Sequence, residues 1–357
     1  MNYSLNTYLI ATCIADFVSK LHDFTFSRPI TPKLMAATAN LRAFPYNLFS
    51  CLMRYGYRKM IKWPLITLFL CSVFYIHYRG KVRHTWLRQS TDHSTFMAPI
   101  NAFMTLFSHL PDRPYHRLDS YPEIRPLADQ WQVIRDEALA LQEHIKTSAN
   151  FDDAGFNSFF RRGWARFYLK WYGESHPSAR QRCPRTVAIL ESIPIIKAAM
   201  FAQLPPGADL GRHRDPYAGS LRYHLGLVTP NDDRCFIVVD GIPYSWRDGE
   251  AVIFDETYIH WAANESNKNR IILFCDLERK MKWPWAQAVN RWFGRKVMAA
   301  TAAPNDMQDR TGGVNRAFRH VYAVRRAGKK LKMHSKPLYY IVKWSLLLSI
   351  VSGILLI

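Results

Sequence analysis

The chain has 357 residues and a formal net charge of +20, and 14% of its residues are aromatic. This length accommodates one catalytic domain of about 200 residues with attachments. Its six cysteines form no Cys-x-x-Cys pair, which argues against a disulfide framework or a structural zinc site and favours a cytoplasmic domain. The charge predicts an anionic partner. A membrane surface suits the many aromatic residues, and nucleic acid is the rival partner.

The N-terminal part of the chain is expected to carry a membrane anchor. Residues 1–62 form an extension without the ordered regions of a signal peptide, and Met53 or Met60 is an alternative start of the natural product. An apolar run at 63–78 follows it with basic residues on both sides, and we expect a transmembrane helix there. The run is shorter than most spans, so a buried core helix is the alternative.

A second apolar run, 337–357, is expected to span the membrane or to lie in its interface. The basic segment 325–332 precedes it, which places that side in the cytoplasm. Residues 79–120 then form a juxtamembrane linker, and 281–336 form a basic, aromatic region after the central domain. Within this region, Lys282–Arg295 is interpreted either as a segment on the bilayer surface or as a helix that packs its tryptophans under the domain.

The central domain, 121–280, is predicted to be mainly β with flanking helices. Apolar residues at steps of three and four predict one amphipathic helix that covers a sheet: Leu127, Trp131, Ile134, Ala138, Leu141 and Ile145. Short apolar runs separated by Pro-Gly and Asp-Gly turns predict strands: Thr186–Leu190, Ala199–Leu204, Leu221–Val228, Cys235–Val239, Ala251–Phe254 and Arg270–Cys275. Such strands favour a double-stranded β-helix, a jelly-roll or cupin-like core.

The candidate site is the set His213, Asp215 and His260, with Arg270 ten residues later. Two imidazoles and one carboxylate in this order can hold one iron(II) by a single face and leave three positions open. At i and i+2, His213 and Asp215 point the same way from a strand. Singly, each residue has an ordinary explanation, such as a turn begun by Asp215-Pro216. Their order and strand context together favour the iron site.

The three coordination positions that the protein leaves open on the iron indicate which co-substrates it would use. A 2-oxo acid can occupy two of them and dioxygen the third. A dicarboxylate would also need a cation for its distal carboxylate, and a planar guanidinium forms the forked pair that an ammonium cannot. Arg270, which opens the strand after His260, is placed for that role. The sequence therefore predicts an oxygenase.

Three segments resemble the aspartyl/asparaginyl β-hydroxylase family of iron(II)/2-oxoglutarate dioxygenases: 213–227, 246–260 and 269–274. The resemblance covers about residues 120–280. It implies that His213 and His260 bind iron and that four residues contact 2-oxoglutarate: Trp164, Arg222, His224 and Arg270. The chain departs from the peptide-hydroxylating members at two positions. It has the carboxylate of Asp215 where they have none, so the role of Asp215 as third ligand rests on coordination chemistry. It also has Ala202 where they have a serine that contacts the co-substrate.

Segments 75–83 and 94–99 resemble a membrane-anchored branch of the family, the lipid A hydroxylases. This resemblance implies hydroxylation of carbon 2 of a secondary acyl chain of lipid A at the cytoplasmic face of the bacterial inner membrane. The phosphates of lipid A would then face the basic surface. The alternatives are a protein aspartyl or asparaginyl β-hydroxylase and, in another class, a membrane-tethered binding module. No obligate protein partner is inferred.

Overall fold

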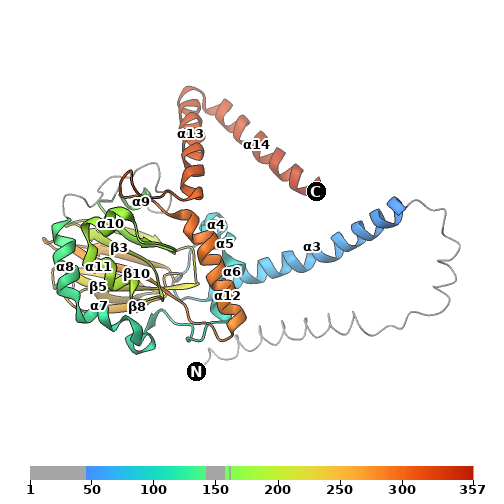
Figure 1. Cartoon of the computed structure of the whole chain (residues 1–357). Helices are drawn as coiled ribbons and strands as arrows, with labels where there is room; N and C mark the ends of the chain where they lie inside the picture. Colours follow the sequence, from blue (N-terminus) through green and yellow to red (C-terminus); the bar gives the residue numbers. More distant parts are fainter. Residues whose placement is uncertain (1–45, 142–156, 161, 357) are drawn as a thin grey trace. The chain divides into compact units, whose positions relative to one another are not determined.

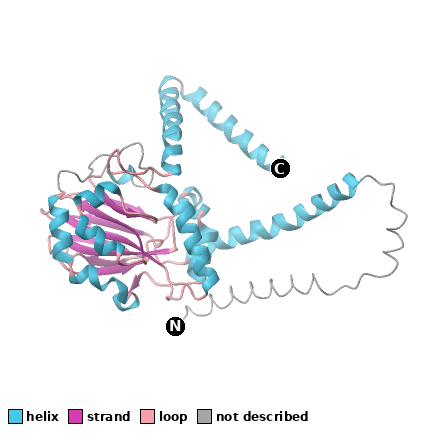
Figure 2. Ribbon diagram, viewed as in Figure 1, coloured by secondary structure: helices cyan, strands magenta, loops and turns pink. Residues whose placement is uncertain are grey.

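The structure is a computed structural model that describes residues 46–141, 157–160 and 162–356. The chain divides into two compact units, Met1–Ile66 and Thr67–Ile357. The second unit contains two antiparallel sheets and the helices that surround them (Figures 1 and 2).

The larger sheet has six strands in the order β1-β8-β5-β10-β3-β2, and the smaller sheet has four in the order β4-β9-β6-β7. From β3 to β10 the chain passes back and forth between the sheets, which is the winding of a double-stranded β-helix. The predicted mainly β core is therefore confirmed. The strands of the larger sheet are β1 (Tyr115–His116), β2 (Ala165–Trp171), β3 (Ile196–Leu204), β5 (Ser220–Val228), β8 (Ala251–Phe254) and β10 (Arg270–Glu278). Those of the smaller sheet are β4 (Asp209–His213), β6 (Cys235–Val239), β7 (Ile242–Ser245) and β9 (His260–Asn264).

Side-chain alternation along β10 separates an apolar layer from a polar interior. All nine residues of this strand are buried. Its odd-numbered residues, such as Leu273 and Leu277, belong to the apolar cluster under the helices, whereas Ile272 and Phe274 face the second cluster, between the sheets. Because successive residues of a strand point to opposite faces, Arg270 and Asp276 share the inner face with them.

Helices cover the outer face of the larger sheet (Figure 1). Among them are α7 (Arg125–Asp129), α8 (Trp131–Ala140), α10 (Pro177–Arg182) and α11 (Pro184–Glu191). The remaining α-helices of the described residues do not belong to this layer (Figure 1): α3 (Tyr46–Tyr78), α4 (Trp86–Thr91), α5 (His93–Phe96), α6 (Ala98–Leu106), α9 (Asn157–Phe160), α12 (Pro284–Phe293), α13 (Gly313–His334) and α14 (Lys336–Leu356).

Two predicted elements of the central domain differ from the structure. Thr186–Leu190 is not a strand but lies in α11, where Pro184 occupies the first turn and apolar residues recur with helical spacing. The amphipathic helix begun at Leu127 is interrupted at Gln130, which separates α7 from α8, and Ile145 lies outside the described residues. Short apolar runs do not by themselves distinguish strands from buried helices.

The transmembrane helix predicted at 63–78 and the membrane-spanning alternative for 337–357 are not supported, while the interfacial alternative for 337–357 stays a prediction. These runs lie in α3 and α14. Among the described residues, no helix has both the length and the apolarity needed to cross a membrane. The first run is shorter than a typical span of about 20 residues. The last turns of α3 instead pack against the domain, because Val73 and Ile76 are buried against Ala98 of α6.

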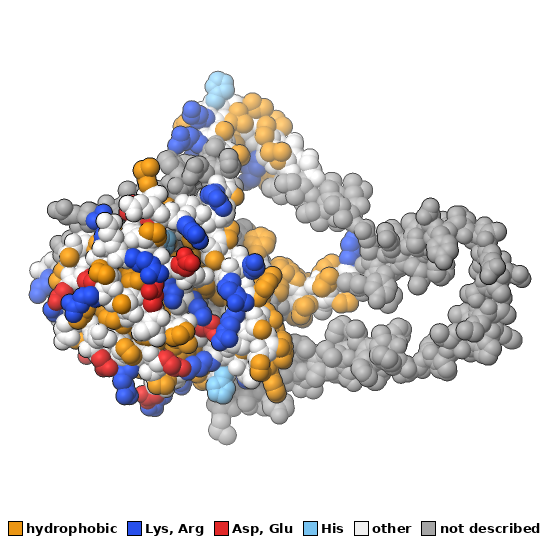
Figure 3. Space-filling model, viewed as in Figure 1, with side chains coloured by type: hydrophobic (Ala, Val, Ile, Leu, Met, Phe, Trp, Pro, Cys, Tyr) orange, Lys and Arg blue, Asp and Glu red, His pale blue; other side chains and the backbone are white. Residues whose placement is uncertain are grey.

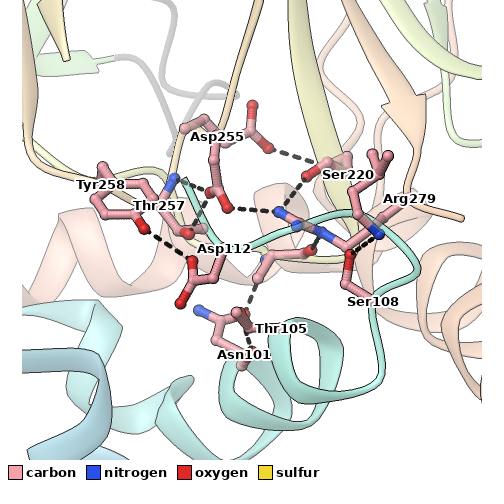
Figure 4. A network of polar contacts seen from close by, with 12 residues as sticks. Asn101, Thr105, Ser108, Asp112, Ser220, Asp255, Thr257, Tyr258 and Arg279 are labelled. Carbon is pink, nitrogen blue, oxygen red and sulfur yellow. Dashed lines mark hydrogen bonds and ion pairs between the residues drawn. The ribbon is translucent and has the colours of Figure 1, made fainter. Parts of the chain in front are cut away.

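A buried ionic network holds the turn between β8 and β9 (Figure 4). Asp255 accepts hydrogen bonds from Thr257 at 3.0 Å and from Arg279 at 2.7 Å, and it also pairs with Arg79. Arg79 in turn pairs with Asp112 at 2.6 Å. Burial alone would raise the pKa of Asp255, but the two guanidinium groups outweigh burial and hold this pKa well below its usual range.

We expect Asp255→Asn to lower the free energy of unfolding at neutral pH by about 3 kcal/mol, because buried Arg279 loses its carboxylate partner and Arg79 keeps only Asp112. A depressed carboxyl pKa stabilises the fold above the unfolded-state pKa of about 4, and this stabilisation is lost as the pH falls. The variant should therefore also lose part of the acid dependence of stability. Denaturant titrations between neutral and acidic pH measure both effects. Asp119→Asn, at an exposed pair, is the control and should change little.

Candidate metal centre

The three predicted ligands meet at one edge of the smaller sheet. His213 ends β4 and His260 begins β9, and the two residues are directly paired across the strands. Asp215 follows two residues after His213. One ligand atom from each residue lies within 4.8 Å of the others, and His213 Nε2 is 3.7 Å from an oxygen of Asp215. The structure thus brings together the set that the sequence indicated.

Backbone carbonyls orient both imidazoles for metal binding. Nδ1 of His213 lies 2.6 Å from the carbonyl oxygen of Gly211, and Nδ1 of His260 lies 3.0 Å from that of Tyr258. A proton donated from Nδ1 leaves Nε2 as a lone pair facing the site. Burial lowers the pKa of both rings, that of His260 to about 3, so both are neutral, as ligands must be.

The carboxylate of Asp215 is held from behind by Arg222. The backbone N–H of Asp215 donates to the carbonyl of Glu256 at 2.9 Å, and one of its carboxylate oxygens pairs with Arg222 at 2.8 Å. Burial alone would raise the pKa of Asp215, but Arg222 and the two imidazoles outweigh it and lower this pKa. Asp215 is therefore an ionised oxygen donor beside two nitrogen donors, and the three residues fit a single iron(II).

Arg222 is shared among three buried carboxylates. Besides Asp215 it pairs with Glu256 and, through Nε at 2.9 Å, with Asp276, which lies directly opposite on β10. Burial raises the pKa of Glu256 well above its ordinary value and also raises that of Asp276, which keeps the cluster from carrying three uncompensated charges. Tyr172 completes the network by donating to Asp276 at 3.0 Å.

One cavity adjoins the three ligands. Its walls contain all seven residues singled out in the sequence: Trp164, His213, Asp215, Arg222, His224, His260 and Arg270. Apolar side chains provide much of the remaining wall, among them Phe159, Leu210, Ile237, Phe254 and Ile272. Ala202, at the position of the family's serine, is also part of the wall.

Arg270 is a buried cation in this cavity. Only 2% of it is exposed, its guanidinium stacks 4.3 Å from the ring centre of Trp246, and the described part of the chain offers it no carboxylate partner. Burial lowers its pKa to about 10, which leaves it charged. Burying an uncompensated charge is costly, so an anionic ligand is the simplest explanation of its position.

Other polar atoms of the cavity wall also lack partners in the structure. They are both ring nitrogens of His224, Nε1 of Trp246 and Nε of Arg270. Burial and two nearby arginines hold the pKa of His224 well below its ordinary value, so it is neutral. These groups are suited to hydrogen-bond a ligand with several oxygen atoms.

Sequence reasoning did not single out Trp246, Glu256 or Asp276. The signal for Asp276 was available, because it stands six residues after Arg270 and so shares its face of the strand. Trp246 and Glu256 reach the site through the packing of loops, which local spacing does not reveal.

Residues 128–280 match the family model described as aspartyl/asparaginyl beta-hydroxylase. It is 32% identical over 188 residues to an ornithine lipid ester-linked acyl 2-hydroxylase of Rhizobium tropici, which covers 52% of this chain and 66% of that protein. It is 30% identical over 178 residues to the human aspartate beta-hydroxylase domain-containing protein 2, with coverages of 47% and 48%. The human aspartyl/asparaginyl beta-hydroxylase is 28% identical over 159 residues, with coverages of 43% and 21%.

Among solved structures, a prolyl-4-hydroxylase of Pseudomonas putida aligns with a TM-score of 0.29 and 17% identity, covering 43% of this chain and 88% of that one. The chain thus spans less than two thirds of the length of each of the three protein relatives named above.

We expect Arg222→Lys to weaken binding of iron(II), or of manganese(II) as its stand-in, by about 10- to 100-fold. A lysine keeps the charge but cannot pair with Asp215, Glu256 and Asp276 in the same planar geometry. Metal titration under anaerobic conditions measures the effect. Arg247→Lys, at an exposed pair with Asp233, is the matched control. Wild-type metal affinity in a folded Arg222→Lys protein would mean that Arg222 does not position the ligand.

Proposed function

We propose that the protein is an iron(II)/2-oxoglutarate-dependent dioxygenase that hydroxylates carbon 2 of an acyl chain of a membrane lipid. The observation that carries this proposal is the buried, unpaired guanidinium of Arg270 in the same cavity as His213, Asp215 and His260. The triad supplies the donors for iron, and the guanidinium supplies the site for a distal carboxylate.

His213, Asp215 and His260 would hold the iron, which when bound supplies the activation of dioxygen for attack on a C–H bond. One oxygen atom enters the acyl chain as a hydroxyl, and the other enters succinate as 2-oxoglutarate loses carbon dioxide. Arg270 would bind the distal carboxylate of 2-oxoglutarate, with Trp246 packed against the guanidinium. The implied contacts of Trp164, Arg222 and His224 with 2-oxoglutarate stay predictions.

The walls of the cavity support an apolar substrate group. Phe159 and Leu210 are partly exposed at the cavity, while Phe254 and Ile272 are buried deeper in it. Such walls exclude water from the reacting carbon and accept a hydrocarbon chain without leaving polar groups unpaired. His213, in ring contact with Phe159 at 4.7 Å, adjoins this apolar side.

For the substrate we propose a secondary acyl chain of lipid A, at the cytoplasmic face of the bacterial inner membrane. Two observations support a lipid. The relative from Rhizobium tropici is named an acyl 2-hydroxylase of a lipid, and the net charge of +20 suits phosphorylated lipids. The relatives named as aspartyl/asparaginyl beta-hydroxylases make a peptide side chain the second candidate.

We expect His213→Ala and Asp215→Ala each to abolish 2-hydroxylation of the lipid, because either variant removes one of three metal donors. Mass spectrometry of lipid A from cells that express each variant measures the product. Asp119→Ala replaces an exposed aspartate and should keep wild-type product levels. Full hydroxylation in either site variant would refute the metal centre, whereas an added oxygen on peptides rather than lipid would support the second candidate.

We expect Arg270→Lys to raise the concentration of 2-oxoglutarate needed for half-maximal succinate formation by about tenfold or more, because an ammonium cannot form the forked pair with a carboxylate. The affinity of the protein for iron(II) alone should remain unchanged. Arg117→Lys, at an exposed position, is the control. An unchanged requirement for 2-oxoglutarate would show that Arg270 does not bind it.

A further inference from the structure

Helix α12 packs on the domain through both apolar and polar residues, among them the buried Ala286 and the partly buried Phe293. Its inward side carries Asn290, which is 3% exposed and donates to the carbonyls of Gly219 at 2.9 Å and Arg279 at 3.2 Å. Tyr217 also donates to the backbone carbonyl of Asn290 at 3.1 Å. The helix is therefore held on the domain by apolar packing and by hydrogen bonds on its inner side.

Large apolar side chains occupy the outward side. Trp283, Trp285 and Trp292 are 55%, 53% and 55% exposed. Trp285 contacts the rings of Phe103 and Phe107 on and after α6, at 5.8 and 5.0 Å, and these five residues form what we call the indole patch. The alternative that this segment packs its tryptophans under the domain is therefore wrong. Clustered exposed aromatic residues on a firmly held helix indicate an interaction surface.

Four exposed cations stand within four residues of a tryptophan of the indole patch in the sequence: Lys282, Arg291, Arg295 and Lys296. No acidic residue occurs in the sequence between Glu278 and Asp306. Glu278 itself is buried and pairs with Lys197 and Arg291, although Arg291 remains 57% exposed. In Figure 3, hydrophobic and basic side chains lie next to each other along the side of the domain that α12 forms.

We propose that the indole patch is the surface by which the domain docks on an anionic phospholipid bilayer. Indole rings favour the headgroup level of a membrane, and the four cations match lipid phosphates. A second copy of the chain would bring the same cations against one another, which disfavours self-association. The proposal rests on the proposed lipid substrate and deepens it by assigning the surface that meets the membrane.

The contacts also link the indole patch to the metal centre. Asn101 of α6 accepts from the backbone N–H of Ala218 at 2.9 Å and donates to the carbonyl of Pro216 at 3.0 Å. Tyr217 stacks on Phe293 of α12 at 4.9 Å. The segment that follows Asp215 is thus bound to both helices of the patch, so docking would hold the cavity at a defined position relative to the lipid.

A photo-crosslinking experiment tests the docking surface on the intact chain. Benzoylphenylalanine replaces Trp292 or, as the control, the exposed Leu139 of α8, and each protein is irradiated with phosphatidylcholine vesicles containing phosphatidylglycerol. We expect phospholipid adducts at position 292 and few at 139 in mass spectra. Failure to bind the vesicles, no lipid adduct at 292, equal labelling of both positions, or crosslinks between copies would each overturn the proposal.

Charge variants give a second measurement. Arg295→Gln combined with Lys296→Gln should weaken binding to the phosphatidylglycerol vesicles by roughly tenfold, since each cation near an anionic surface contributes to affinity. Arg182→Gln, at an exposed position of α10, should have little effect, and an equal loss in both proteins would contradict the proposal. Crosslinking and vesicle binding need neither iron nor turnover, so the docking surface and the hydroxylase activity can fail independently.

Discussion

The ion pair between Arg222 and Asp215 is the interaction on which the site depends. Asp215 stands on the irregular segment after β4, whereas Arg222 belongs to β5 in the larger sheet, so their contact joins the two sheets at the metal centre. A buried guanidinium is costly unless several acceptors surround it, and Glu256 and Asp276 supply the others. These contacts orient Asp215, the proposed third metal ligand.

Strands β5 and β10 have one apolar face that packs against helices and one face that carries the polar groups of the candidate site. Along β5 and β10 one set of alternate residues packs beneath α8 and α11, and the other set carries Arg222, His224, Arg270 and Asp276. The largely apolar packing on one face of these strands therefore fixes the positions of the polar groups on the other face. Carboxylates of the protein neutralise Arg222, whereas Arg270 has no such partner among the described residues. This difference is the reason to propose a positioning role for Arg222 and a ligand-binding role for Arg270.

Much of the site could be predicted from the sequence because its parts are local. His213 and Asp215 are two residues apart, and Arg270 opens a strand of recognisable composition. The spacing of Asp276 from Arg270 reveals its face of the strand, but its pairing with Arg222 depends on the register of β5 and β10. The position of Glu256 depends on the turn before β9, which no short pattern encodes. Helix α11 was mistaken for a strand because short apolar runs suit both structures. In the sequence, the membrane was indicated mainly by the two apolar runs, which the structure does not support as spans. The structure instead shows exposed tryptophans at α12, which carry the proposed membrane contact.

The most direct test of the account follows the two atoms of dioxygen. The purified protein, supplied with iron(II), 2-oxoglutarate and lipid A under isotopically heavy dioxygen, should place one heavy atom in the acyl chain at carbon 2 and the other in succinate. Mass spectrometry of both products reads the result. A heavy atom in neither product, or a hydroxylated acyl chain formed without 2-oxoglutarate and without succinate, would contradict the assignment of His213, Asp215, His260 and Arg270 to this chemistry.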